Sequence, residues 1–177
     1  VVEMGAAKAG DIDWLCELAR PTVALLLNAM PAHLQGFGSV DSVATAKGEI
    51  FDRLGETDVA VINADQPWAR QWRKRAAPAT VLDFGLEQPA AISARGIQSR
   101  GVEGVSFTAS TPVGDIAIRL TLPGVHNVSN ALAALAVGFA PISEEIFFRG
   151  LIYNKLRTVM PVWLAIILQG FLFGFIH

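Results

Sequence analysis

Cysteine, tyrosine and histidine are scarce in this sequence, which has 1 Cys, 1 Tyr and 3 His among 177 residues. A disulfide needs two cysteines, so the single Cys16 excludes an intramolecular disulfide. It equally excludes a zinc site built from several cysteines. Cys16 falls on the apolar side of an expected helix. We therefore predict a buried thiol at this position and not a nucleophile.

Charged residues are also few, at 17% of the chain with a formal net charge of -2. No basic patch with interleaved aromatic residues occurs, so we expect no nucleic-acid partner. The charges are unevenly spread, because only five of the Asp, Glu, Lys and Arg residues follow residue 139 and none lies in 158–177. This change near Phe139 predicts two parts, 1–139 and 140–177. Since the chain has no initiator Met and starts within an apparent strand, we also expect its beginning to be missing.

The first part alternates short apolar runs with amphipathic segments. This alternation is typical of βαβ units, and it predicts an α/β fold with a mostly parallel sheet flanked by helices. Between about 79 and 122, short β segments separated by Gly, Ser or Pro predict an antiparallel extension. The expected strands of the parallel part are 1–5, 22–29 and 58–65, and the expected helices are 11–20, 39–54, 66–76 and 124–138.

Three polar residues fall where such a sheet would present them to a ligand. Glu3 lies in the first expected strand, His33 follows the second, and Lys47 lies in the helix after it. An acid and an imidazole at strand ends are able to hold a divalent cation together with phosphate oxygens. Each residue also has an ordinary explanation as a solvated strand end, a loop histidine or a surface lysine. Spacing alone favours these ordinary explanations.

The amino-acid sequences of several segments resemble those of a known family. The stretches "AHLQGFGS", "AKGEIF", "VINAD" and "LPGVHNVSNALAALAV" resemble the central domain of the Mur ligases of peptidoglycan synthesis. Within that family they are most similar to the MurF branch, which adds D-alanyl-D-alanine to UDP-N-acetylmuramoyl-tripeptide. The resemblance covers residues 1–139 and implies ATP-dependent amide formation through an acyl phosphate, with Mg²⁺ neutralising charge on the transferred group.

The resemblance also implies roles for individual residues. Glu3 matches a magnesium ligand at a strand end, and His33 matches a histidine near a second magnesium ion. Lys47 matches a lysine that is carbamylated in the family, a change that turns a cation into a carboxylate-like anion. The nucleotide-contacting segment at the start of a helix matches His126, Asn127 and Asn130. The substrates implied are a UDP-MurNAc-peptide and D-alanyl-D-alanine, in a cytoplasmic setting for residues 1–139.

Two departures from the family pattern bear on nucleotide binding. The family usually has Gly-Arg-His-Asn where this chain has Val125 in place of the arginine. The phosphate-binding pattern G-x-x-x-x-G-K-[ST] does not occur in the sequence. Without that phosphate cradle, most of the electrostatic stabilisation of phosphoryl transfer is missing. We therefore expect weak or no MgATP binding by this chain alone, and no ligase activity.

The last part has a different character. Pro161–Ile176 is apolar except for Gln169, slightly short of the roughly 20 residues that span a bilayer. A buried helix of a water-soluble fold is the alternative, but Trp163 and the flanking cations Lys155 and Arg157 favour a membrane helix. We predict two apolar helices, 141–156 and 161–177, that contact membrane lipid.

The first of these helices carries ionisable residues within apolar surroundings. "EEIFFR" (144–149) and "FGFIH" (173–177) fit the Glu-Glu-x-x-x-Arg and Phe-x-x-x-His motifs of the CPBP intramembrane proteases, which include the CAAX prenyl proteases. By this resemblance Glu144 is a general base, Glu145 and Arg149 are its neighbours, and His177 is a water or metal partner. An ordinary Glu145–Arg149 ion pair is the alternative. A divalent metal at Glu144 and His177 is implied by the family.

The two resemblances meet at about residue 139, and each is partial. The sequence therefore predicts a Mur ligase fragment fused to a CPBP fragment, either naturally or by an assembly error. Three functions stay open: a partial ATP-dependent ligase, a fragment of a membrane endopeptidase, and a membrane-tethered remnant with neither activity.

Overall fold

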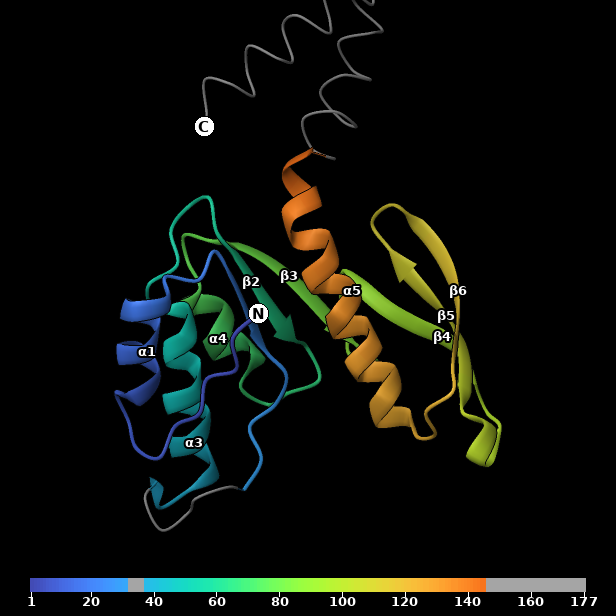
Figure 1. Ribbon diagram of the computed structural model, residues 1–177, viewed down its shortest axis with the longest axis horizontal. Coiled ribbons are helices and arrows are strands. Elements are labelled where there is room, and N and C mark those ends of the chain that lie inside the picture. Colours follow the sequence, from blue (N-terminus) through green and yellow to red (C-terminus); the bar gives the residue numbers. More distant parts are fainter. Residues whose placement is uncertain (32–36, 146–177) are drawn as a thin grey trace, which may run out of the picture. The chain divides into compact units, whose positions relative to one another are not determined.

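A computed structural model of the chain describes residues 1–31 and 37–145 (Figure 1). The chain divides into two compact units, Val1–Val137 and Gly138–His177. Every strand and all but one of the helices named below belong entirely to the first unit. The last helix, α5, ends beyond it.

The first unit is built on one six-stranded sheet whose strands follow the chain order β1 to β6. The strands β1 (Val23–Leu26), β2 (Val59–Asn63) and β3 (Thr80–Gly85) are parallel, and β4 (Ile92–Ser99) meets β3 in parallel at two residue pairs. The strands β5 (Val105–Thr111) and β6 (Gly114–Leu120) continue the sheet in antiparallel pairing. The fold is thus α/β with a mostly parallel sheet and an antiparallel end, as the sequence predicts.

The antiparallel part begins later than the sequence predicts. Residues 80–85 were expected to open the extension, but β3 pairs in parallel with β2 over five residues. The reason is the connection between them: α4 (Ala69–Arg75) carries the chain back across the sheet, so β3 enters in the same direction as β2. A short 3₁₀ turn, Gly101–Glu103, joins the first antiparallel pair.

The expected strand at residues 1–5 is absent. This segment has no regular secondary structure, and the relative exposures of Val1 and Val2 are 130% and 71%. A strand forms only where a partner takes up its N–H and C=O groups, and the described sheet pairs none of its strands with this segment. The apolar composition of residues 1–5 is therefore not sufficient to form a strand.

The helices begin and end where local chemistry favours it. Ser39 caps α3 (Val40–Lys47), with its hydroxyl accepting a hydrogen bond from the Ser42 N–H at 3.1 Å. The helix α1 (Asp11–Ala19) starts after Gly10, which has φ +88°. The Asp11 carboxylate accepts from the N–H groups of Ala7 and Lys8. A 3₁₀ turn, η1 (Gly48–Phe51), extends α3.

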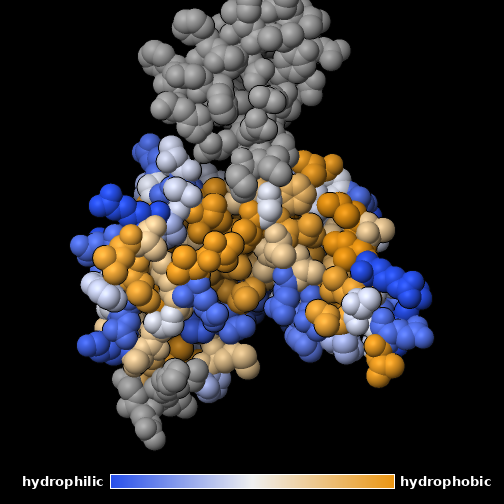
Figure 2. All heavy atoms as spheres, in the orientation of Figure 1, coloured by the Kyte–Doolittle hydropathy of each residue, from blue (hydrophilic) through white to orange (hydrophobic). Residues whose placement is uncertain are grey.

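The main core lies between β1–β2 and the helices α3 and α4. In β2, Ala60 and Ile62 face this core, and Trp72 of α4 is fully buried in it. Val59 and Val61 alternate with them, so they face the other side of the sheet and are buried there. Figure 1 shows α1, α3 and α4 grouped together, with α5 apart from them in front of the strands. Apolar residues also gather over the middle of this view in Figure 2.

Helix α5 (Val125–Glu145) is longer than expected. The sequence predicts that one helix ends near 139 and another begins at Pro141, and that division is wrong, because α5 runs through Pro141. A proline inside a helix removes one hydrogen bond and kinks or breaks many helices, but α5 continues past Pro141 to Glu145. The predicted helices 141–156 and 161–177 otherwise lie outside the described residues. Within the described residues, no helix is long and apolar enough to cross a membrane.

Candidate functional site

Polar side chains converge at the carboxyl ends of β1 and β2, the edge where open α/β sheets bind their ligands. Asn63, the last residue of β2, is 7% exposed and donates from Nδ2 to the carbonyl of Leu27 at 2.9 Å. One residue further, Lys47 Nζ donates to the carbonyl of Asn28 at 3.0 Å. The N–H of Ala29 donates to Gln66 Oε1 at 3.1 Å. Three consecutive residues after β1 are thus each held by a side chain from elsewhere.

A second cluster at the same edge connects β2 to the turn after β3. The Asp65 carboxylate accepts three backbone N–H groups, from Leu86, Glu87 and Gln88, at 2.7, 3.0 and 2.8 Å. The Asp65 N–H in turn donates to Asn63 Oδ1 at 3.0 Å. A Cβ at Gly85 would lie 2.9 Å from Asp65 Oδ1, so the absence of a side chain there makes room for this carboxylate.

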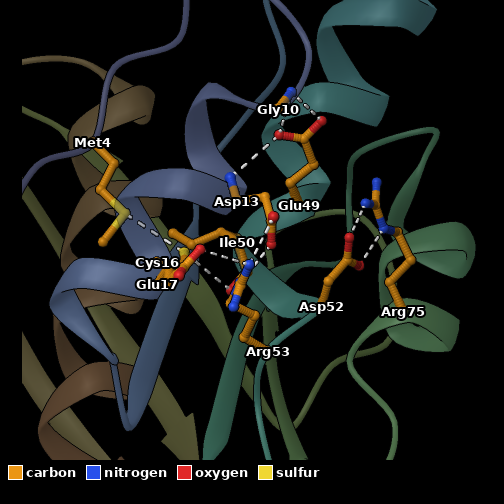
Figure 3. A network of polar contacts seen from close by, with 10 residues as sticks. All are labelled: Met4, Gly10, Asp13, Cys16, Glu17, Glu49, Ile50, Asp52, Arg53 and Arg75. Carbon is orange, nitrogen blue, oxygen red and sulfur yellow. Dashed lines mark hydrogen bonds and ion pairs between the residues drawn. The ribbon is translucent and has the colours of Figure 1, made fainter.

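A third cluster joins η1 to the start of α1 (Figure 3). The Glu49 carboxylate, two residues after Lys47, accepts from the Gly10 N–H with both oxygens, at 2.9 and 3.0 Å. It also accepts from the Asp13 N–H at 3.4 Å. A carboxylate at a helix N-terminus satisfies free N–H groups and interacts favourably with the helix dipole. Glu49 therefore fastens the segment that carries Lys47 to α1.

Ion pairs surround this junction. Arg53 pairs with Asp13 at 2.6 Å and with Glu17 at 3.2 Å, and Arg75 pairs with Asp52. The hydrogen bond from Arg53 holds the pKa of Asp13 below its ordinary value, and the reciprocal bond raises the pKa of Arg53. The Asp52 carboxylate likewise raises the pKa of Arg75. These groups are arranged as structural pairs between α1, η1 and α4.

Cys16 is buried, as the sequence predicts, at 1% exposure. Burial is the main cause that raises its pKa, and its Sγ lies 3.7 Å from the Met4 Sδ. A thiol with a raised pKa is a poor nucleophile. Cys16 is therefore a buried core residue and not a nucleophile.

Of the three predicted magnesium-site residues, the structure describes Glu3 and Lys47 but not His33, so their grouping stays a prediction. Glu3 is exposed in the segment before α1 and makes no hydrogen bond or ion pair there, and His33 lies outside the described residues. Lys47 is half-buried and bound to a carbonyl. In residues 1–31 and 37–145 no group of three or more His, Cys, Asp or Glu is placed to hold a metal ion. An unmodified ammonium donates and does not ligate, so Lys47 would ligate Mg²⁺ only after a modification such as carbamylation.

The residues matched to nucleotide contact lie at the start of α5. Asn127 donates from Nδ2 to the Pro123 carbonyl at 2.8 Å, and Asn130 Nδ2 lies 3.4 Å from Asn127 Oδ1. The imidazole of His126 is exposed and sits where a Cβ on Gly124 would collide with it, 2.5 Å from His126 Cε1. His126, Asn127 and Asn130 thus share one helical end, and their role in nucleotide contact stays a prediction.

The protease-like residues are only partly within the described chain. Glu144 and Glu145 are the last two residues of α5. Arg149 and His177 lie outside the described residues, so the predicted pairing of Glu144 with His177 stays a prediction. Sequence reasoning also passed over Asn63, Asp65 and Gln66. The signal available for them was a run of polar residues directly after a buried strand.

Comparison with known proteins gives two family matches. The Mur ligase middle domain matches residues 1–138, and the type II CAAX prenyl endopeptidase Rce1-like family matches residues 127–177. The two matches overlap within α5. Both agree with the resemblances seen in the sequence.

Individual relatives point to the same branch of the first family. The UDP-N-acetylmuramoyl-tripeptide–D-alanyl-D-alanine ligase of Escherichia coli is 40% identical over 141 residues, covering 79% of this chain and 31% of that protein. The corresponding ligase of Haemophilus influenzae is 39% identical over 137 residues, covering 77% of this chain and 29% of that protein. The chain therefore spans about a third of the length of these curated relatives.

A solved structure shows the same fold. MurF from Acinetobacter baumannii superposes with a TM-score of 0.74 at 33% identity, over 79% of this chain and 30% of that one. The family match to residues 1–138 includes the sheet and the helices that carry the clusters described above. Together with this match, the similar fold places the chain in the Mur ligase family.

Proposed function

We propose that residues 1–138 act as the middle, nucleotide-handling domain of a ligase that joins D-alanyl-D-alanine to a UDP-MurNAc-tripeptide. The observation that carries this proposal is the 40% identity to the E. coli ligase of that name over 141 residues. The matching fold in the A. baumannii protein supports it. The partners are then a UDP-MurNAc-peptide and D-alanyl-D-alanine, in a cytoplasmic setting for this part of the chain.

ATP and Mg²⁺ are the cofactors that the family implies. ATP would supply the phosphoryl group that activates a substrate carboxylate for attack by the amine. Lys47, once carbamylated, would supply an oxygen ligand that its ammonium form lacks, and Glu3 and His33 are the other proposed ligands. His126, Asn127 and Asn130 are the proposed nucleotide contacts. Because the sequence has no phosphate loop, we propose that the chain alone binds MgATP weakly and has no ligase activity.

A graft tests the proposed function directly. The matching segment of the E. coli ligase is replaced by residues 1–138, and phosphate release that depends on D-alanyl-D-alanine is measured. We expect the graft to retain activity and the graft with Lys47→Ala to lose it, because Lys47 is proposed as a metal ligand. A graft with Lys74→Ala, an exposed lysine on α4, is the matched control. A folded graft without activity would refute the proposed function.

The match to the Rce1-like family favours a second candidate, a fragment of a membrane endopeptidase. In that case Glu144 is the general base, Glu145 and Arg149 its neighbours, and His177 a water or metal partner. The segment 141–177 would then associate with the membrane. We expect no proteolysis by this chain, because the family's further histidine motif is absent from the sequence. Cleavage of a membrane peptide by the parent chain that is lost in Glu144→Gln would overturn that expectation.

A further inference from the structure

The segment Leu27–Ala29 is attached to its surroundings by side chains and not by a sheet ladder. β1 ends at Leu26, so the backbone groups that follow have no strand partner. Asn63 binds the Leu27 carbonyl, and Gln66 binds the Ala29 N–H. Between them, the Asn28 carbonyl accepts the hydrogen bond from Lys47 Nζ. The position of that carbonyl therefore depends on the two side chains that hold its neighbours.

These two side chains come from one short stretch, residues 63–66, whose own geometry is fixed. Asn63 is oriented by the Asp65 N–H at its Oδ1, so its amide presents Nδ2 to Leu27. Asp65 is itself held by the three N–H groups of the turn after β3. Asn63 is the one buried polar residue among the residues that the structure describes. A buried amide with both ends satisfied is a rigid connection.

We propose that Asn63, Asp65 and Gln66 form a positioning network that sets the place of the Lys47 ammonium through the Leu27–Ala29 backbone. The network runs from the turn after β3, through Asp65 and Asn63, to Leu27 at the end of β1. Gln66 completes it by binding the N–H of Ala29, the residue after Asn28. Lys47 is thereby held half-buried at the ligand edge of the sheet. The value of this position to a ligase rests on the proposed function, but the network itself does not.

Gln66 is the best point at which to break the network. It is half-exposed, so its loss does not open the core, and it is linked to the segment by a single hydrogen bond. Gln66→Ala removes the acceptor for the Ala29 N–H and frees the Asn28 carbonyl to move. Gln66→Glu keeps an acceptor at the same place. Gln71→Ala, on the exposed side of α4, is a matched control, because within the described structure the Gln71 amide contacts only Thr45 Oγ1, at 3.5 Å.

The test measures the accessibility of Lys47 in the full chain. A short pulse of acetic anhydride is followed by peptide mass spectrometry, with the exposed Lys74 as the internal reference. We expect Gln66→Ala to raise the labelling of Lys47 relative to Lys74 by roughly two- to tenfold, the range of net hydrogen-bond strengths. Gln66→Glu and Gln71→Ala should match the parent. Asp65→Asn, which keeps the side-chain size, should give a smaller rise.

The outcomes separate this proposal from a general effect on stability and from the proposed function. A parallel rise at Lys47 and Lys74 would mean that the fold has loosened as a whole, and an unchanged ratio would mean that Gln66 does not position Lys47. Either result overturns the network. The labelling needs neither ATP nor Mg²⁺, so a graft that is inactive while Lys47 still responds to Gln66→Ala would refute the ligase and leave the network standing.

Discussion

The second and the last strands of the sheet differ most in how they are covered. All five residues of β2 are buried, whereas none of the seven residues of β6 is buried and four are exposed. A parallel strand between crossover helices is covered on both faces, while an antiparallel hairpin tolerates water on one or both. In β1 and β2 the one polar side chain, that of Asn63, therefore lies at the strand end. In the antiparallel half polar side chains lie along the strand, as those of Asp115 and Arg119 do.

The buried polar contacts of this fold are therefore concentrated at one edge of the sheet. At the carboxyl ends of β1 and β2, the side chains of Asn63 and Gln66 bind the backbone on either side of Asn28, whose carbonyl accepts from Lys47. The hairpin of β5 and β6 makes peripheral polar contacts, such as the exposed ion pair between Arg95 of β4 and Asp115 of β6. Substitutions in each half should show whether the more buried half also contributes more to the free energy of unfolding.

The largest effect is expected in the parallel half at Trp72. Its side chain is fully buried, and its Nε1 donates to the Ala44 carbonyl at 3.0 Å, so Trp72→Ala leaves a cavity and removes this hydrogen bond. We expect a loss of about 3–5 kcal/mol in the free energy of unfolding, measured by urea denaturation. Trp14→Ala is the matched control, because Trp14 is 59% exposed on α1 and should lose less than about 1 kcal/mol. Equal losses would contradict the assigned core.

A smaller and more local effect is expected in the antiparallel half at Gly104. This residue has φ +104°, and a Cβ there would lie 1.9 Å from the Leu120 carbonyl oxygen. Gly104→Ala should therefore move β6 away from β5 and cost about 1–3 kcal/mol of strain. Hydrogen exchange should quicken in β5 and β6 and stay unchanged in β2.

The control for this hairpin is Gly114→Ala. Gly114 also has positive φ, +122°, but nothing lies within 4 Å of the added Cβ. Its substitution carries the conformational strain without the collision, so it separates the two causes. If both variants open the hairpin equally, the collision with Leu120 is not what Gly104 avoids.

The sequence predicts elements better than it predicts contacts. Alternating apolar runs located β1, β2 and the helices, because burial imposes a period that the chain records locally. The hydrogen bond from Lys47 to Asn28 joins residues 19 apart, and it depends on the register of β1 against β2, which no local pattern encodes. Thus Lys47 was located on its helix, but its partner was not.

Two of the errors have the same origin. Residues 1–5 have the composition of a strand, yet strand formation depends on a partner elsewhere in the chain. The parallel pairing of β3 is decided by the crossover through α4 and not by the residues of β3. Pro141 was expected to begin a helix, since prolines favour the first turn, but α5 continues through it. In the first two cases a tertiary condition overrode a local preference.

The smallest effect concerns the ion pairs of the parallel half and appears only in acid. Because Arg53 lowers the pKa of Asp13 in the folded state, the unfolded state binds more protons as the pH falls below the ordinary carboxyl value of 3.8. The contribution of this pair is therefore complete above that value and is lost as the pH falls through the folded pKa. We expect Asp13→Asn to lower the melting temperature slightly at neutral pH, with the difference from the parent shrinking below about pH 4. Glu56→Gln, at an exposed residue without an ion pair in the described structure, should show no such convergence. A difference that stays constant from neutral to acid pH would mean that the Asp13 charge is not what stabilises the junction of α1 and η1.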